Sequence, residues 1–305
     1  IESGATTVRF PMAAPDDGVA IVRVSDEQGF AADNARHHLF EPPPRSLVTL
    51  VATEADDGAV LFLEQALSPR GEEGPFTVEV RAASALADDG AVDLASGVAI
   101  LTGTSRLTRR GRERLAAVVR SGGGLLLAAG PDVDQTLVNA LFEGEADLGL
   151  GEVESLDSRR SLVLAARRHS SLVPLGDLAS SLDRVRFDRR RAIGAGDLVV
   201  ARFDDGAPAL VEHRIGEGRV LVWASDLAGA WNDLPRQPVF APWLTETVAS
   251  LSSATSPARA FVVSEAPPGV PDRPGIAALA SEGGGQRTIV VNAAPAESAL
   301  ERLAP

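Results

Sequence analysis

The segment 97–129 reads GVAILTGTSRLTRRGRERLAAVVRSGGGLLLAA and predicts a strand, a helix and a second strand in succession. Residues 97–101 and 125–129 are apolar runs of strand length. Between these runs, apolar residues recur at helical spacing. The predicted helix starts after Thr108, a suitable N-cap, and ends before three consecutive glycines. Strands that are apolar throughout are typical of parallel sheets covered on both faces, so the segment predicts a βαβ unit.

The same alternation extends over residues 45–254, where we predict a single α/β domain. The predicted strands are 46–52, 76–82, 97–101, 125–129, 198–203, 209–215 and 219–223, and the predicted helices are 58–67, the segment after Thr108, 133–142 and 238–252. The last three strands are joined by tight turns and are expected as an antiparallel hairpin set at the sheet edge. The pattern predicts a doubly wound, mainly parallel, flavodoxin-like sheet, with any ligand crevice beyond the carboxyl ends of its strands.

The two flanks of this domain are predicted to be small β segments. Residues 1–44 are too short to bury a core alone, so we predict the tail of a β-sandwich whose earlier strands lie upstream of Ile1. Residues 255–305 are proline-rich and are predicted to form a small β appendage. The strand-like runs in the flanks are 7–10, 19–24, 259–263 and 288–292.

The composition excludes several classes of chemistry. The 305 residues contain no cysteine, lysine or tyrosine, which removes thiol nucleophiles, disulfides, Schiff bases and the P-loop lysine. The formal net charge of −13 argues against nucleic acid and anionic membrane surfaces, since both require a basic patch. No apolar run approaches the roughly 18 residues of a membrane-spanning helix. No cofactor is indicated.

Three stretches of the chain resemble one family of bacterial membrane proteins. They are residues 105–130, 197–234 and 288–300, and the most specific part is AWNDLP at 230–235 together with the preceding GEGRVLVWASDL. They are similar to the soluble region of aerotolerance-regulator (Bat-type) proteins, including its class I glutamine amidotransferase-like domain. This resemblance implies membrane anchoring through segments outside the fragment, a place on the periplasmic side of the bacterial envelope, and protein partners.

The positions that correspond to amidotransferase catalysis hold no suitable side chains. The resemblance places the nucleophile elbow near 128–130, which is Ala-Ala-Gly, and the base after the strand that ends at Trp223, where Ala224, Ser225 and Asp226 follow. The usual thioester route from glutamine requires a cysteine and a histidine at these places. We therefore expect a non-catalytic scaffold or protein-interaction module rather than an enzyme.

An alternative hypothesis is a small-molecule-binding or hydrolytic site at the carboxyl edge of the sheet. Residues 132–136 read DVDQT, which is similar to the nucleophile motif of haloacid-dehalogenase-like phosphatases, but acids at this position also cap helices. The polar residues of the loop after Trp223 have two possible roles. They could contact a ligand, or they could form hydrogen bonds with the backbone and fix the loop. The candidate crevice residues are Thr102, Thr104, Asp132, Asp226, Trp231, Asn232 and Asp233.

The remaining polar motifs predict structural roles. The histidines His37, His38, His169 and His213 lack the spacing of a metal site, and we expect His213 to face solvent. The pair Gly216 and Gly218 predicts a hairpin turn. Residues 145–197 show no regular pattern, and the arginines at 184–191 are expected to form an exposed face paired with acids or, alternatively, an anion site.

Overall fold

The computed structural model describes residues 18–24, 34–40, 46–53, 58–68, 75–87, 97–142, 144–252, 260–280 and 286–294. The chain divides into two compact units, one formed by residues 1–42 together with 257–305 and the other by residues 43–256.

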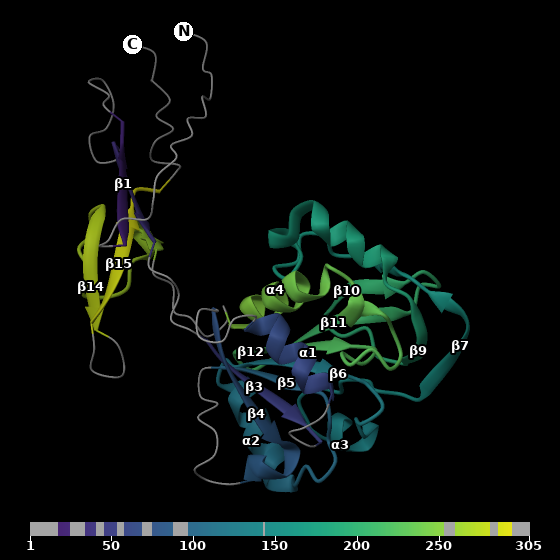
Figure 1. Cartoon of the computed structure of the whole chain (residues 1–305). Helices are drawn as coiled ribbons and strands as arrows, with labels where there is room; N and C mark the ends of the chain where they lie inside the picture. The colour runs from purple at the N-terminus through teal and green to yellow at the C-terminus, as the bar shows by residue number, and fades with distance from the viewer. Residues whose placement is uncertain are drawn as a thin grey trace. The chain divides into compact units, whose positions relative to one another are not determined.

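The larger unit is built on an eight-stranded sheet. Its strands are β3 (Ser46–Ala52), β4 (Phe76–Ala82), β5 (Val98–Leu101), β6 (Gly124–Ala128), β8 (Leu162–Leu164), β10 (Leu198–Phe203), β11 (Pro208–Ile215) and β12 (Gly218–Trp223). They lie in the order β4-β3-β5-β6-β12-β11-β10-β8 (Figure 1). The first five strands are parallel to one another, and the last three continue the sheet in antiparallel pairs. The predicted α/β unit with a large, mainly parallel sheet is therefore confirmed.

Helices cover both faces of this sheet. They are α1 (Gly58–Leu67), α2 (Arg109–Arg120), α3 (Gln135–Asn139) and α4 (Phe240–Ser252), with 3-10 segments η1 (Ala83–Ala87), η2 (Val173–Arg184) and η3 (Leu234–Arg236). The helices α1 and α4 pack together on one face, while α2 packs with η1 on the other (Figure 1). Because both faces are covered, the central strands β5 and β6 are buried along their whole length and contain no polar side chain.

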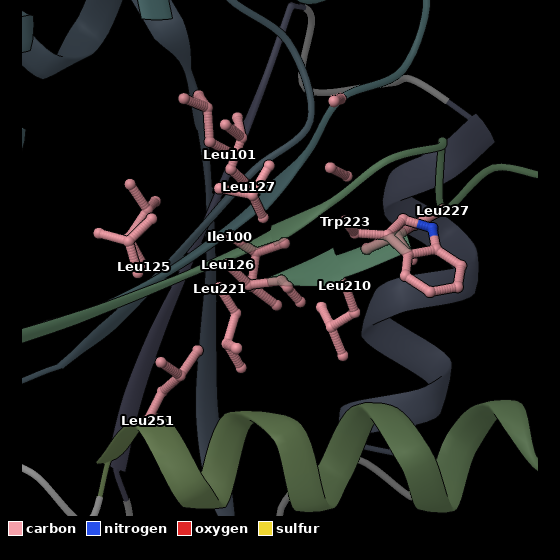
Figure 2. Packing of buried hydrophobic residues seen from close by; sticks show 14 of the residues in the cluster. Ile100, Leu101, Leu125, Leu126, Leu127, Leu210, Leu221, Trp223, Leu227 and Leu251 are labelled. Carbon is pink, nitrogen blue, oxygen red and sulfur yellow. The ribbon is translucent and has the colours of Figure 1, made fainter. Parts of the chain in front are cut away.

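The core shows this two-sided burial directly. All five residues of β6 are buried. Figure 2 shows Leu126 and Leu221 on the side of the sheet that faces α4, whereas Leu125 and Leu127 lie on the opposite side. Alternate residues of a strand point to opposite faces, so a continuous apolar run fills both layers of the core. The indole rings of Trp223 and Trp243 pack on the α4 side with their centroids 5.2 Å apart.

The helix boundaries follow local capping. Thr108 accepts a hydrogen bond from the Gly111 N–H at 3.1 Å and begins α2, as predicted. The predicted helix at 133–142 is shorter in the structure, because Asp134 caps α3 only at Gln135. It ends at Asn139, whose side chain exchanges two hydrogen bonds with the Leu150 backbone instead of continuing the helix.

Residues 145–197 contain strands that the sequence analysis does not assign. A second, two-stranded antiparallel sheet is formed by β7 (Val153–Arg160) and β9 (Phe187–Arg191), and β8 forms the far edge of the main sheet. The sequence of β7 is VESLDSRR, with most of its residues exposed or half-buried. A strand with so few apolar positions carries no hydrophobic alternation, so pattern alone does not detect it.

The smaller unit joins both flanks of the chain. It contains β1 (Val19–Arg23), β2 (Ala35–Leu39), β13 (Ala260–Val262), η4 (Val263–Glu265), β14 (Gly275–Ala280) and β15 (Gln286–Asn292). The backbone N–H of His37 donates to Asn292 Oδ1 at 2.7 Å, and Asn292 Nδ2 donates back to the His37 carbonyl at 3.0 Å. The sequence analysis treats the flanks as two separate segments, since a pairing across more than 250 residues leaves no local signal. The strand predicted at 7–10 lies outside the described residues.

Candidate functional site

The loop after β5 holds Thr102 and Thr104 through backbone contacts. The Thr102 N–H and hydroxyl both donate to the Val51 carbonyl, at 2.9 and 3.2 Å. Thr104 is buried, donates its N–H to the Asp132 carbonyl at 2.9 Å, and accepts from the Asp134 N–H at 2.7 Å. Both threonines therefore tie neighbouring loops of the sheet edge together.

The loop after β6 uses its second aspartate as a helix cap. Asp134 Oδ1 accepts from the N–H groups of Thr136 and Leu137 at 2.8 and 3.1 Å. The side chain of Asp132 is exposed and has no hydrogen bond or ion pair within the described part of the chain. The capping interpretation of the DVDQT stretch is thus the one that the geometry favours.

The carboxylate of Asp226, directly after β12, is surrounded by donors from its own loop. Oδ2 accepts from the N–H groups of Ala228 and Ala230 at 3.0 and 2.7 Å, and Oδ1 accepts from the Trp231 N–H and Asn232 Nδ2 at 3.0 and 2.9 Å. An ionised carboxylate offers about four lone-pair sites, and four donors occupy them here. The group is 4% exposed, so no acceptor position is left for a substrate proton.

The last three candidates complete the same loop. Asn232 donates to Asp226 and Ser225 and accepts from the Leu234 N–H at 2.9 Å. The Trp231 carbonyl accepts from the Asp188 N–H at 2.8 Å, and Asp233 Oδ1 accepts from the Arg186 N–H at 2.8 Å. These bonds join the loop at 225–234 to β9 and to the residues just before it.

Arg191, at the end of β9, closes the sheet edge from the other side. Its guanidinium donates to five acceptors, namely the carbonyls of Ala129, Gly130, Val133 and Gly151 and the side chain of Gln135, at 3.0 to 3.5 Å. Burial lowers the pKa of Arg191 from its ordinary value. The sequence analysis places this residue only within a charged run, because nothing local shows that its side chain meets the ends of β6.

Two glycines bring the loops into direct contact at this edge. A Cβ on Gly130 would lie 2.8 Å from Cβ of Asp226, and one on Gly103 would lie 2.4 Å from Oγ1 of Thr53. The carboxyl ends of neighbouring strands therefore touch, leaving their side chains directed to backbone partners. Of the seven candidates, Asp132 alone presents a free carboxylate, which does not favour a convergent small-molecule or hydrolytic site.

The expectation of an exposed face paired with acids is met by one further arginine of the run, Arg190, whereas the guanidinium of Arg186 donates to the carbonyls of Asp183 and Val185. Arg190 contacts Glu154 and Asp205, each at 2.7 Å, and its guanidinium lies 5.0 Å from the ring centroid of Phe203. The hairpin turn predicted between β11 and β12 is confirmed, with Gly216 at a φ of +58°.

The expectation that His213 faces solvent is wrong. Its side chain is buried, at 6% exposure, because β11 lies inside the sheet and packs against Gly196. Burial lowers the pKa of His213 below its ordinary value of 6.5, and Asp197 and Asp147 oppose this effect. Among the described residues no group of three or more histidines and acids could hold a metal ion.

A buried polar cluster lies around His169, which the sequence analysis does not connect with Glu212. His169 Nε2 lies 2.9 Å from Glu212 Oε2, and His169 Nδ1 lies 2.7 Å from Oγ of Ser171. The hydrogen bond from His169 lowers the pKa of Glu212, with Arg219 and Arg214 adding to the effect against the opposing burial. This Ser-His-Glu order resembles a catalytic relay, but Ser171 is 0% exposed, so its hydroxyl is inaccessible to a substrate.

No family model and no curated protein matches this sequence. Several solved structures have a similar fold. A cytoplasmic protein from Salmonella typhimurium LT2 is 16% identical over 68% of this chain and 99% of its own, with a TM-score of 0.51. A second cytoplasmic protein from Salmonella typhimurium is 14% identical over 68% of this chain and 98% of its own, with a TM-score of 0.48. A ThuA-like protein from Bacteroides uniformis ATCC 8492 is 12% identical over 69% of this chain and 92% of its own, with a TM-score of 0.46.

At these identities the similarity concerns the fold alone. Within the described part of the chain, none of the helices combines the length and apolar character needed to cross a membrane.

Proposed function

We propose that this chain is a non-catalytic, amidotransferase-like scaffold or protein-interaction module. The observation that carries the proposal is the state of the carboxyl edge of the sheet, where folds of this class hold their ligands. The carbonyls of Ala129 and Gly130, at the expected elbow, accept from Arg191, and the carboxylate of Asp226 is occupied by four donors of its own loop. Side chains committed in this way support a structural role.

The proposal includes a more specific fold class for the larger unit. The five parallel strands run β4-β3-β5-β6-β12, and if they are numbered along the chain this is the order 2-1-3-4-5 of flavodoxin-like folds. The three antiparallel strands then extend that core on the β12 side. This order supports a flavodoxin-like, class I glutamine amidotransferase-like domain, in line with the sequence resemblance.

We also propose the cellular setting that the Bat-type resemblance implies. In this setting the chain is the periplasmic-side portion of a membrane-anchored bacterial protein, held by segments outside these 305 residues. Its partners are proteins, and the net charge of −13 disfavours nucleic acid.

A glutaminase assay tests the non-catalytic part of the proposal. The purified chain is incubated with glutamine, and ammonia release is compared with that of an active amidotransferase and of a protein-free blank. We expect release at the level of the blank, because no thiol is present to form the thioester. Release above the blank that is retained through repurification would overturn the proposal.

Cross-linking in the native membrane tests the interaction part. The full-length protein is tagged, cross-linked in cells and purified, and recovered proteins are identified by mass spectrometry. We expect specific protein partners that are absent when an unrelated protein with the same tag and membrane anchor is used. Recovery of no specific partner over a range of ionic strengths contradicts the proposal.

A reporter fusion tests the location. Alkaline phosphatase, which is active only outside the cytoplasm, is fused after residue 305 of the full-length protein, and a green fluorescent protein fusion provides the opposite readout. Phosphatase activity supports the periplasmic side. Fluorescence without phosphatase activity contradicts it.

A further inference from the structure

A depression of about 400 Å³ lies between α2 and the residues that follow α3. Its lining residues are Arg109, Arg112, Glu113, Ala116, Arg120, Ala140 and Leu141. Five of them are spaced at i, i+3, i+4, i+7 and i+11 along α2, which is one face of a helix. The volume falls within the range of small-molecule sites, about 300 to 1,000 Å³.

Arg112 stands in this depression without a partner. Its Nε is buried and has no hydrogen bond, and no acid within the described residues pairs with its guanidinium. A guanidinium offers five N–H donors in a planar fork that suits phosphate and carboxylate oxygens. The side chain as a whole is half-buried, and a buried N–H donor without an acceptor is unfavourable, so this guanidinium can bind an anion that enters the depression.

The acids near the depression are already engaged by the other two arginines. Arg109 Nε lies 2.8 Å from Oε1 of Glu113, and Arg120 Nε lies 2.7 Å from Oε1 of Glu145. Three guanidinium groups and two carboxylates therefore leave one positive charge, and it resides on Arg112. This local excess contrasts with the net charge of −13 of the whole chain.

The position of these charges on α2 adds a second argument. The first turn of α2 contains no acid and starts with Arg109 and Arg110, although the positive end of the helix dipole disfavours cations. Arginines here weaken the helix unless they serve another purpose. A bound anion would be stabilised by the guanidinium groups and by the helix dipole together.

We propose that this depression binds a phosphate group of a small metabolite, such as a nucleotide or a sugar phosphate. Arg112 provides the bidentate contact, and Arg109, whose Nε is bound to Glu113, adds a second contact through its terminal N–H groups. A phosphate group has three acceptor oxygens and nearly two charges, enough for both arginines. The remainder of the ligand lies over Ala116, Ala140 and Leu141. This inference does not depend on the scaffold proposal, because the site lies on α2.

Isothermal titration calorimetry with matched pairs of probes tests the site. The pairs are AMP against adenosine and glucose-6-phosphate against glucose, at low and at physiological ionic strength. We expect saturable binding of at least one phosphorylated probe and none of its unphosphorylated counterpart. The Arg112→Gln variant should weaken that binding by about tenfold or more, since it removes a charge-assisted contact.

The control is Arg110→Gln, which removes the same charge from the same helix at an exposed position outside the depression. Arg110→Gln should change the dissociation constant by no more than about twofold, because solvent and salt screen the effect of an exposed charge on a distant ligand. If Arg112→Gln does not fold, Ala140→Glu tests the same point, because it supplies an internal carboxylate to Arg112 and should abolish binding.

Four outcomes overturn the proposal. They are no saturable binding of either phosphorylated probe, equal binding of the unphosphorylated probes, equal weakening by Arg110→Gln and Arg112→Gln, and full competition by citrate at the concentration of the phosphorylated probe. The last would assign the depression to carboxylates.

Discussion

Charged side chains at the carboxyl edge of the sheet differ from Arg112 on α2 in the number of hydrogen-bond partners that surround them. At the edge, Asp226 is buried with four donors and Arg191 is buried with five acceptors. On α2, the Nε of Arg112 is buried and finds no acceptor among the described residues. A buried ion with a complete set of partners holds its surroundings in place, whereas a half-buried guanidinium without them is free to bind an anion, as we propose for Arg112. The difference supports our two proposals, that the polar residues of the sheet edge are structural and that the depression beside α2 binds an anion.

Removing the carboxylate of Asp226 should have the largest effect on stability. Asp226→Ala leaves the N–H groups of Ala228, Ala230 and Trp231 without the buried carboxylate that accepts from them. We expect a loss of about 3 to 5 kcal/mol in the free energy of unfolding. Urea unfolding followed by tryptophan fluorescence measures it. Asp226→Asn should lie between the wild type and Asp226→Ala, because its amide has one acceptor oxygen.

The exposed Asp132 is the matched control. Asp132→Ala removes the same group from the same sheet edge and should change stability by no more than about 0.5 kcal/mol, as for an ordinary surface position. If Asp132→Ala lost as much stability as Asp226→Ala, the stability of this edge would depend on its negative charge and not on the hydrogen bonds that Asp226 accepts.

Replacing Arg191 should have the next largest effect. Arg191→Met keeps the length of the side chain but leaves the carbonyls of Ala129, Gly130 and Val133 without a donor. We expect a loss of about 2 to 4 kcal/mol, measured by the same unfolding experiment. Arg191→Lys should recover only part of it, since one ammonium group cannot reach acceptors spread around a guanidinium. Full recovery by lysine would mean that charge alone matters at this position.

Acid should destabilise the larger unit in two steps. The pKa of buried His213 is below 6.5, so as the pH falls below 6.5 the unfolded chain takes up a proton first and stability decreases. The pKa of Glu212 is below its ordinary 4.5, so its stabilising contribution is present above 4.5 and is lost as the pH falls further. Urea midpoints measured over this range should show His213→Gln to be less pH-dependent than the wild type between 6.5 and 4.5. Parallel curves for the two proteins would contradict the assignment.

The smallest effect is expected at Arg112. Without ligand, Arg112→Gln should change the free energy of unfolding by no more than about 0.5 kcal/mol, because no hydrogen bond of the described chain is lost. A loss of several kcal/mol would instead assign Arg112 a structural partner and remove the contrast with Arg191. The measurement needs no ligand, so it is independent of the binding experiment.

The parts of the fold that were predictable are those with two-sided burial or a local cap. The apolar run of β6 and the helix behind Thr108 could be recognised because their patterns are set by residues a few positions apart. The strands β7 and β9 have no local signal because β7 has no buried position, β9 contains three consecutive arginines, and the two pair across more than 25 residues. The joining of β2 to β15 through His37 and Asn292 has no local signal either.

The candidate site illustrates the same limit. The sequence analysis correctly locates polar residues after β5, β6 and β12, because the carboxyl ends of parallel strands are where such residues gather. Whether Asp226 accepts from its own loop or faces solvent depends on the path of the backbone from Ala228 to Trp231. The burial of His213 likewise depends on which strand lies beside β11.

By itself, the sequence determined the α/β class of the larger unit, the absence of thiol, lysine and tyrosine chemistry, and the N-cap of α2. These follow from residue identity and from contacts within one or two helical turns. The tertiary structure alone decided the hydrogen-bond partners of Arg191 and Asp226. The role of a charged side chain depends on which groups surround it once it is buried, and those groups come from parts of the chain that only folding brings together.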